Sequence, residues 1–259
     1  MSAELKSTTE GGTMVLTLSN PGQRNTLGPE IYAAGVEALE GAENSQEVRC
    51  VVITGEGDCF CAGGPLPRLA TDRERDPQAQ ADSIDAMHGW IDAIRTFPKP
   101  VIAAVEGAAA GAGFALALAC DFVVAARSAV FAASHGKVGL SPDGGLSWQL
   151  GRALPRQLAS EWLMLGGRVD AERLHAFGLV NELADAGRAL DAALALAARL
   201  ADAAPNLLAS IKELLAEAPA AGIESQMIRE REHFMRNLHH PNAGIGIAAF
   251  LDKRTPRYR

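Results

Sequence analysis

Short runs rich in β-branched residues alternate with stretches of helical periodicity through the first half of this chain. The runs, each bounded by Gly, Pro, Asn or Asp, are Thr13–Ser19, Arg49–Thr54, Pro100–Val105 and Asp121–Ala126. Runs of this length and composition are typical of strands. Between them, Pro29–Glu40 and Asp82–Arg95 place apolar residues at helical spacing, and the first of these has a proline in its first turn. The alternation predicts an α/β core.

The last third of the chain has a different pattern. From about Ala171 onward the strand signals stop and helical periods follow one another. These periods are Leu190–Ala201, Pro205–Glu217 and Gly222–Leu238. We therefore predict an α/β core over residues 1–199 and a helical region over residues 200–259. Residues Pro65–Gln80 are rich in proline and charge and lack amphipathic order, which predicts a mobile surface loop.

Length, composition and charge exclude several classes of protein. With 259 residues, 48% of them hydrophobic and 21% charged, the chain has the composition of an ordinary globular protein rather than of a disordered or fibrous one. The formal net charge of −7 opposes a sequence-independent attraction to nucleic-acid phosphates. We therefore expect no nucleic-acid partner.

The sequence has no feature of a membrane anchor or a secretory signal. Met1–Gly12 contains charged residues and no apolar core, and the most apolar stretch, Ala108–Cys120, is too short to span a bilayer. We therefore expect a cytoplasmic protein without a membrane partner. The four cysteines lack the paired spacing of a zinc or redox site, which predicts buried free thiols and no metal site.

Two glycine-containing turns, Gly57–Gly64 and Gly107–Gly113, each follow a predicted strand. Bare backbone in such a turn lets a ligand atom approach closely. The second turn runs directly into the apolar segment Phe114–Ala119, so its amides lie at a helix N-terminus, where N–H groups are unpaired and negative charge is favoured. Its spacing, G-x-x-x-G-x-G, differs from the G-x-G-x-x-G of dinucleotide-binding loops, and the G-x-S-x-G of serine hydrolases is absent. The turns therefore predict a ligand site of neither class.

Five segments, in order along the chain, carry a specific resemblance. They are RNTL (Arg24–Leu27), FCAGG (Phe60–Gly64), KPVIAAVEGAAAGAGFALALACD (Lys99–Asp121), KVGLSPDGGLSWQL (Lys137–Leu150) and AAFLDKR (Ala248–Arg254). Together they resemble the signature segments of the enoyl-CoA hydratase/isomerase, or crotonase, superfamily. The resemblance implies an α/β spiral of repeated ββα units over residues 1–199 that binds an acyl-CoA thioester, and a C-terminal helical trimerisation region over residues 200–259. It also implies a homo-trimer or a dimer of trimers, with coenzyme A arriving as part of the substrate and no separate cofactor.

The resemblance also assigns roles to individual groups. It implies that the amides of Gly64 and Ala112 stabilise the negative charge that develops on the thioester oxygen; turn residues needed only for their backbone conformation are the structural alternative. Residue by residue, the positions it brings into contact with substrate or CoA are Arg24, Ala62, Gly63, Leu66, Gly111, Phe250 and Lys253. Phe250 and Lys253 would reach CoA bound to a neighbouring subunit. For the cations Arg24 and Lys253, an exposed solubilising role is the alternative.

Departures from the family pattern indicate which reaction this chain performs. Hydratases of the family use two glutamates, and the corresponding positions here are Ala115 and His135. Alanine cannot move a proton, so water addition by two carboxylates is not expected. Asp143, between a proline and two glycines, lies where isomerases of the family carry their catalytic carboxylate. We therefore predict that Asp143 performs a 1,3 proton transfer on an enoyl-CoA, with a helix N-cap as its structural alternative.

Other readings of the same residues stay open. His135 is either a proton carrier near neutral pH or a structural histidine. The segment Ser134–Trp148 resembles isomerases of phenylacetate degradation, which favours an enoyl-CoA isomerase. The alternatives are a hydratase (lyase) that uses other residues, an acyl-CoA hydrolase or dehalogenase in which Asp143 attacks as a nucleophile, and a non-catalytic CoA-binding member. The last is favoured if Asp143 points away from the two amides.

Overall fold

A six-stranded sheet forms the centre of the fold in the computed structural model, which describes residues 3–75 and 77–258. In spatial order its strands are β1 (Glu4–Glu10), β2 (Thr13–Ser19), β3 (Cys50–Gly55), β4 (Val101–Val105), β6 (Phe122–Ala126) and β9 (Glu182–Ala184). Strands β1 and β2 form an antiparallel hairpin, and the remaining pairs are parallel. A smaller sheet contains β5 (Ala108–Ala110), β7 (Val130–Ala132) and β8 (Arg168–Asp170). The α/β class expected from the sequence is therefore confirmed.

Consecutive strand pairs wind through both sheets. Strand β4 lies in the large sheet and β5 in the small one, and α4 (Ala112–Ala119) follows. Strands β6 and β7 repeat this order before α5 (Leu146–Ala153). The segment after β3 reaches the small sheet through a bridge between Cys61 and Ala109, and then enters α2 (Leu66–Arg75). Each turn of the chain is thus a ββα unit, which confirms the expected spiral.

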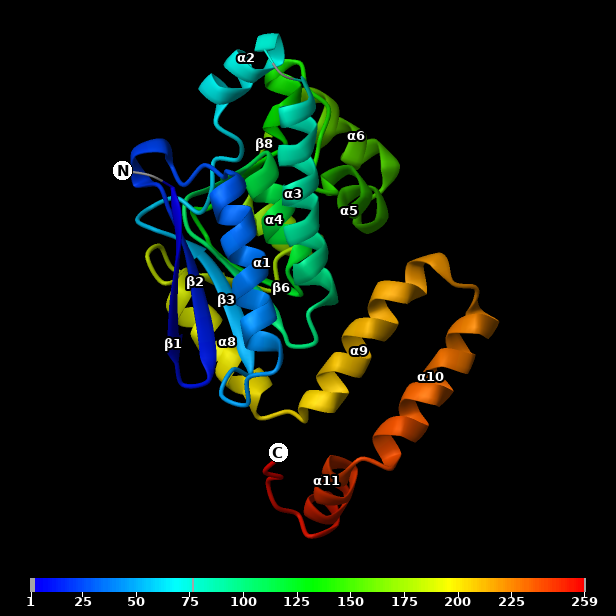
Figure 1. The fold of residues 1–259 in the computed structure, drawn as a ribbon. Coiled ribbons are helices and arrows are strands. Elements are labelled where there is room, and N and C mark those ends of the chain that lie inside the picture. Colours follow the sequence, from blue (N-terminus) through cyan, green and yellow to red (C-terminus); the bar gives the residue numbers. More distant parts are fainter. Residues whose placement is uncertain (1–2, 76, 259) are drawn as a thin grey trace.

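The central strands bury side chains on both faces of the large sheet. In β3, Val51 and Ile53 belong to the core cluster that includes residues of α1 (Pro29–Glu43) and α3 (Pro77–Thr96). Cys50 and Val52 belong to the cluster that includes residues of α8 (Ala189–Ala201). A mostly parallel sheet covered on both faces has continuously apolar strands, as the sequence runs do. The remaining helices of the core are α6 (Arg156–Leu165) and α7 (Ala171–Ala176). Figure 1 shows α1 and α3 side by side in front of the sheet and α8 behind it.

Three helices at the C-terminal end extend away from the core as an arm (Figure 1). This C-terminal arm, residues 205–258, contains α9 (Pro205–Glu217), α10 (Ile223–Leu238) and α11 (Pro241–Leu251). The three helices expected from the periodicity of this region match α8, α9 and α10 within one residue at each end. Within the described residues no single helix is long and apolar enough to cross a membrane, although α8 and Pro205–Ala220, bent by 108° at their junction, pass that test as a pair.

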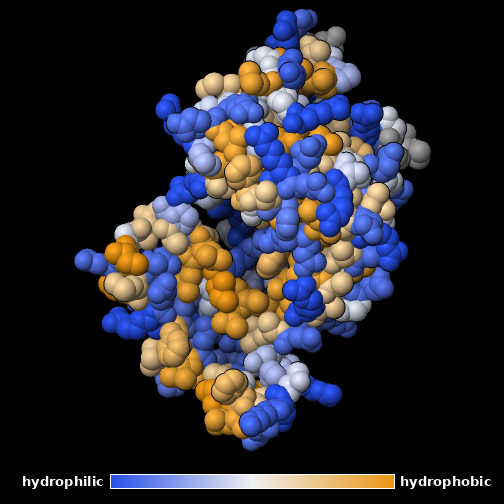
Figure 2. Space-filling model, turned by 180° about the vertical axis from the view of Figure 1, so that it is seen from behind, coloured by the Kyte–Doolittle hydropathy of each residue, from blue (hydrophilic) through white to orange (hydrophobic). Residues whose placement is uncertain are grey.

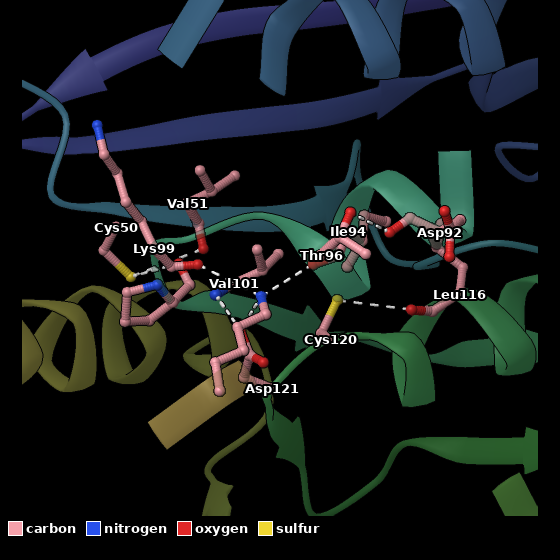
Figure 3. Close-up of polar contacts among 12 residues, drawn as sticks. Cys50, Val51, Asp92, Ile94, Thr96, Lys99, Val101, Leu116, Cys120 and Asp121 are labelled. Carbon is pink, nitrogen blue, oxygen red and sulfur yellow. Dashed lines mark hydrogen bonds and ion pairs between the residues drawn. The ribbon is translucent and has the colours of Figure 1, made fainter. Parts of the chain in front are cut away.

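An ion pair ties the C-terminal arm to the core. The ammonium group of Lys212 in α9 donates to the carboxylate of Asp121 at 2.7 Å and to the carbonyl oxygen of Ile94 at 2.9 Å. The Asp121 carboxylate also accepts from the backbone N–H of Val101 at 2.8 Å. Figure 3 shows Asp121 beside Val101. Burial raises the pKa of the Asp121 carboxyl above its ordinary value, and the Lys212 ammonium opposes that rise. The carboxylate therefore joins α9, β4 and the start of β6.

Two expectations from the sequence are wrong. Residues Pro65–Gln80 contain α2 and the first turn of α3 rather than a surface loop, with Asp76 outside the described residues. Prolines in this segment stand near helix starts, where the missing N–H has no intrahelical partner to lose, and Arg68 pairs with Asp72 one turn later at 3.1 Å. The strands also do not end before Ala171, because β9 lies after it and pairs with β6. That strand has three residues and none is β-branched, so its local pattern gives no signal.

Candidate active site

The two glycine turns lie side by side, which aligns their backbone amides. Cys61 and Ala109 form a parallel bridge, and the N–H of Ala110 donates to the carbonyl of Cys61 at 2.9 Å. Gly64 and Ala112 each lie three residues beyond the bridged pair. The parallel register therefore places these two amides at matching positions along the two neighbouring segments.

The amides of Gly64 and Ala112 are free donors. Neither N–H has a hydrogen-bond acceptor among the described residues, whereas the neighbouring N–H of Gly63 donates to the sulfur of Cys61 at 3.4 Å. Ala112 is the first residue of α4, where unpaired N–H groups and the helix dipole favour negative charge. The pair is therefore preorganised to hold a developing oxyanion.

Glycine at two positions allows the turns to approach each other. Gly63 has a φ of 89°, and a Cβ there would lie 2.7 Å from the carbonyl oxygen of Ala110. A Cβ on Gly113 in α4 would lie 2.4 Å from the carbonyl oxygen of Cys61. A larger residue at either position would push the turns apart and separate the two free amides.

A cavity of about 490 Å³ is lined by both free amides. Its largely apolar wall comes from α1, α2, α3 and the segment just before α1, and includes Leu27, Tyr32, Leu66, Leu69, Ile84 and Met87. The segment between β7 and α5 contributes Ser134, His135, Lys137, Val138, Leu140, Ser141 and Asp143. Within the part of the chain that the structure describes, Asp143 is the only carboxylic acid of this lining. An apolar cavity with a few convergent polar groups is typical of a small-molecule site.

Asp143 is paired with His135 across the base of this cavity. The Nε2 atom of His135 lies 2.9 Å from the Oδ1 atom of Asp143, and their side chains are 11% and 30% exposed. The Nδ1 atom of His135 is buried and has no partner among the described residues. A proton on Nδ1 would bury an unpaired N–H, so the neutral tautomer with its proton on Nε2 is favoured, and Nε2 donates to Asp143. The carboxylate thus points into the cavity of the two amides rather than away from them.

The N-cap alternative for Asp143 is wrong. Helix α5 begins at Leu146, with Gly145 at its N-cap position and no side-chain cap. Only the backbone carbonyl of Asp143 contacts this helix end, accepting from the N–H of Leu146 at 3.1 Å. The side chain is therefore available to the cavity because the two following glycines, both with positive φ, turn the backbone before the helix starts.

Ala115, which the family resemblance aligns with a hydratase glutamate, lies in a tightly packed place. Ala115 is fully buried in α4, and a Cβ on Gly144 would lie 2.7 Å from the Cβ of Ala115 and 3.0 Å from Ile91. The turn that carries Asp143 therefore packs directly on the side chain at 115. A longer side chain there would displace this turn.

The structure brings together most of the residues expected in the site, but not all. Those that line the cavity are Ala62, Gly64, Leu66, Gly111, Ala112, His135 and Asp143. Gly63 is buried and does not line the cavity, and Arg24 is exposed, with its carbonyl oxygen accepting from the N–H of Ala62 at 3.0 Å. Phe250 and Lys253 lie at the end of the C-terminal arm, exposed and away from this cavity.

Sequence reasoning missed two side chains at the site, Tyr32 and His88. Tyr32 lines the cavity from α1 and is 5% exposed. The Nε2 atom of His88 accepts from the N–H of Gly144 at 3.3 Å, next to Asp143. Tyr32 lies on the apolar stripe of its helix, and periodicity does not distinguish a core position from a cavity wall. His88 reaches the turn only through the packing of α3 on it.

The thiols near the site are not nucleophiles. Cys61 is fully buried beneath the amides, and burial raises the pKa of its thiol to about 12, so the nucleophilic thiolate is not formed near neutral pH. All four cysteines are free and buried, as expected from their spacing. Across residues 3–75 and 77–258, no group of three His, Cys, Asp or Glu side chains is placed to hold a metal ion.

A family model for enoyl-CoA hydratase/isomerase matches residues 8–259 of the chain. The chain belongs to the enoyl-CoA hydratase/isomerase family. The 1,2-epoxyphenylacetyl-CoA isomerase of Escherichia coli strain K12 is 36% identical to this family member over 254 residues, which cover 96% of this chain and 95% of that protein. The 2,3-dehydroadipyl-CoA hydratase of the same organism is 33% identical over 246 residues, with 95% and 94% covered.

Solved structures agree with this assignment to the enoyl-CoA hydratase/isomerase family. The crystal structure of an enoyl-CoA hydratase from Polaromonas sp. JS666 matches with a TM-score of 0.98 and 65% identity, over 99% of this chain and 100% of that one. The crotonase fold and an enzyme that processes acyl-CoA thioesters are therefore confirmed. Because the relatives include an isomerase and hydratases, the reaction of this family member depends on its own site.

Proposed function

We propose that the protein is an enoyl-CoA isomerase that shifts a double bond by a 1,3 proton transfer. The observation that carries this proposal is the position of Asp143, the only carboxylic acid in the described lining of the cavity that holds the two free amides. Ala115 and His135 supply no second carboxylate. One carboxylate is sufficient for a proton transfer in which the same group first removes and then returns the proton.

The proposed reaction begins with a 3-enoyl-CoA whose thioester oxygen accepts from the amides of Gly64 and Ala112. The Asp143 carboxylate removes a proton from the carbon between the double bond and the carbonyl. The electron pair of that C–H bond spreads over a dienolate, whose oxygen carries the charge that the amides stabilise; losing one such donor typically costs about 2.7–4 kcal/mol. The Asp143 carboxyl then returns the proton two carbons further along, and the double bond becomes conjugated with the thioester.

His135 has a positioning role in this proposal. Its Nε2–H group holds one oxygen of Asp143 at 2.9 Å, so the carboxylate keeps one orientation while its other oxygen faces the substrate. Preorganisation of this kind lowers the cost of reaching the transition state.

A paired assay of the purified protein tests this function. Wild type and Asp143→Asn are each given a 3-enoyl-CoA, with conjugation followed spectroscopically, and a 2-trans-enoyl-CoA, with hydration followed. We expect the double-bond shift to dominate in wild type and to fall by about 10²–10⁴-fold in Asp143→Asn. Asp85→Asn, an exposed substitution on α3, is the matched control. An Asp143→Asn protein with full isomerase activity would overturn the proposal.

Hydration is the second candidate, because His135 and Asp143 form a pair that can activate water. In this reading the Asp143 carboxylate, held by the Nε2–H of His135, takes a proton from water as the hydroxyl group adds to carbon 3 of the 2-trans-enoyl-CoA, and the Asp143 carboxyl then returns the proton to carbon 2. The 2,3-dehydroadipyl-CoA hydratase among the relatives gives this candidate support by name. Hydration that dominates in the paired assay and disappears in His135→Phe would favour it over the double-bond shift.

We propose further that the C-terminal arm is an oligomerisation region that forms a homo-trimer or a dimer of trimers. Its exposed apolar side chains are Leu207, Ile211, Leu215, Ile223, Met227, Ile228, Phe234, Met235, Leu238, Ile247, Phe250 and Leu251. Figure 2 shows apolar surface of this arm gathered in continuous patches on the side facing the viewer. Patches of this extent are typical of interfaces. In such an assembly Phe250 and Lys253 would contact CoA bound to a neighbouring subunit, and CoA would enter only as part of the substrate.

A further inference from the structure

Tyr32 presents a fixed phenol ring to the active-site cavity. The ring lies on the inner side of α1, is 5% exposed and packs at a tilt against Trp90 of α3, with 6.4 Å between ring centroids. Gly35, three residues later, makes room for this indole, because a Cβ there would lie 2.2 Å from its Nε1 atom. The position of the phenol is therefore set by core packing before any ligand binds.

The hydroxyl group of Tyr32 has no protein partner. It forms no hydrogen bond with any of the residues that the structure describes. The hydroxyl oxygen is not among the fully buried, unpaired polar atoms of the described residues, although the ring that carries it is buried. Solvent or a ligand can therefore reach this oxygen. Since Tyr32 lines the cavity, the hydroxyl opens into it. Buried tyrosine hydroxyls usually find a hydrogen-bond partner, so this one is available to a ligand.

Two charged groups share the cavity with this hydroxyl. The carboxylate of Asp143 and the guanidinium of Arg68 in α2 both act electrostatically on the phenol, and both line the same cavity. The phenol therefore faces the same cavity as the two free amides and Asp143, from the side of α1. An acyl chain with its thioester oxygen on the amides and its reacting carbons at Asp143 shares this cavity with Tyr32.

The cavity wall formed by α1, α2 and α3 is largely apolar. Its apolar side chains include Leu69, Ile84 and Met87, and its polar side chains besides Tyr32 are Arg68, Gln80 and Ser83. A rigidly held donor in a largely apolar wall orients a ligand and discriminates between ligands that do and do not accept a hydrogen bond.

The phenol acts as a donor and not as an acid. Burial raises the pKa of Tyr32 above its ordinary value, the negative charge of Asp143 adds to this rise, and the Arg68 guanidinium opposes it. The group therefore keeps its proton throughout the neutral range. A group with a raised pKa is a poor proton carrier, so binding is the role that its chemistry supports.

We propose that the hydroxyl of Tyr32 donates a hydrogen bond to an oxygen atom on the acyl chain, so that the preferred substrates are acyl-CoA thioesters with a hydroxyl, ether or carbonyl oxygen beyond the thioester group. This inference rests on the proposed function in one respect, namely that the acyl chain lies across the amides of Gly64 and Ala112 and past Asp143.

Binding of saturated acyl-CoA thioesters tests the inference, because these ligands have no double bond to shift. Hexanoyl-CoA and its derivatives with one hydroxyl at carbon 3, 4, 5 or 6 are titrated by calorimetry into wild type and Tyr32→Phe. In wild type at least one hydroxylated derivative should bind roughly tenfold more tightly than hexanoyl-CoA, as one hydrogen bond allows. In Tyr32→Phe this preference should disappear while hexanoyl-CoA binds as in wild type.

The other tyrosine of the chain provides the matched control. Tyr258 packs against Gly246 in the C-terminal arm, away from the cavity, so Tyr258→Phe should keep the preference for the hydroxylated ligand. The inference is overturned if wild type prefers none of the derivatives, or if the preference survives in Tyr32→Phe. Both results are independent of the isomerase assay, because an enzyme without isomerase activity still binds these ligands.

Discussion

The Nε2 atom of His135 donates to the Oδ1 atom of Asp143 across 2.9 Å, and the two residues come from opposite ends of the same segment between β7 and α5. The helical turn Ser134–Val138 and the glycine pair after Asp143 fold this segment back on itself. As a result, a histidine stands beside the carboxylate that we propose as the catalytic group.

Replacing His135 should lower turnover more than binding. His135→Phe removes the donor to Asp143, and because a hydrogen bond to a charged group contributes about 1.5–3 kcal/mol, we expect kcat of the double-bond shift to fall by about 10–100-fold with KM nearly unchanged. His135→Gln keeps an N–H donor at a similar reach and should recover part of the loss. Steady-state kinetics of both variants check this, and equal kcat losses in the two would contradict a positioning role.

Removing the amide of Ala112 should abolish most of the activity without unfolding the protein. Ala112 is the first residue of α4, a position where proline is tolerated, so Ala112→Pro deletes the N–H and leaves the helix. We expect a fall of about 10²–10³-fold in kcat, the typical effect of losing one oxyanion donor. Circular dichroism and the thermal midpoint serve as the folding control. Undiminished turnover in a folded Ala112→Pro protein would exclude this amide from the site.

Introducing the missing glutamate should not create an efficient hydratase. Ala115 is fully buried against Gly144, so Ala115→Glu must displace the turn that carries Asp143 or bury a carboxylate. We expect a loss of about 1–3 kcal/mol in the free energy of unfolding from overpacking, with hydration still negligible. Urea unfolding and the hydration assay measure the two effects. A stable variant that hydrates 2-trans-enoyl-CoA efficiently would show that packing at this position does not limit the chemistry.

The pair between Lys212 and Asp121 should make the stability of a variant depend on pH. In Lys212→Met the Asp121 carboxylate, whose side chain is 23% exposed, loses its cation, which should cost about 1.5–3 kcal/mol near neutral pH. Burial already raises the pKa of Asp121, and without the ammonium that opposes it the pKa rises further. A carboxyl whose pKa is raised in the folded state binds more protons there than in the unfolded chain. Stability therefore falls as the pH rises from the unfolded-state pKa of Asp121 to its folded-state pKa. The deficit of Lys212→Met relative to wild type should therefore be small near pH 4 and grow toward pH 8. Urea midpoints across this range check the sign, and a deficit that shrinks as the pH rises would contradict it.

Phe250 tests the proposed contact with a neighbouring subunit. This side chain is 84% exposed and lies away from the cavity of its own chain. If it contacts CoA across an interface, Phe250→Ala removes binding far from the reacting carbons, and KM should rise about tenfold with kcat unchanged. Met164→Ala, at an equally exposed apolar position on α6, is the control. An unchanged KM would place the contact elsewhere, and light scattering reports whether the assembly itself has changed.

Local patterns in the sequence predicted most of the elements and part of the site. Side-chain periodicity, which acts over a few residues, predicted the strands β3 and β4 and the helices α8, α9 and α10. The motifs around Gly64, Ala112 and Asp143 identified the family, and Ala115 marked its departure from the hydratases. The segment Pro65–Gln80 was misjudged, because its helix is short and polar and packs over the cavity mainly through scattered leucines.

The sequence by itself determined the alternating core, the glycines that permit close backbone approach and the type of acid available, because these depend on residue identity and short-range spacing. The tertiary structure alone decided that the two amides lie at matching positions, that His135 meets Asp143, that Gly144 closes the space at Ala115 and that the Tyr32 hydroxyl opens into the cavity. Each of these relationships joins segments that are brought together only by strand register and helix packing. Contacts of that kind are set by the whole core at once, so no local pattern along the chain encodes them.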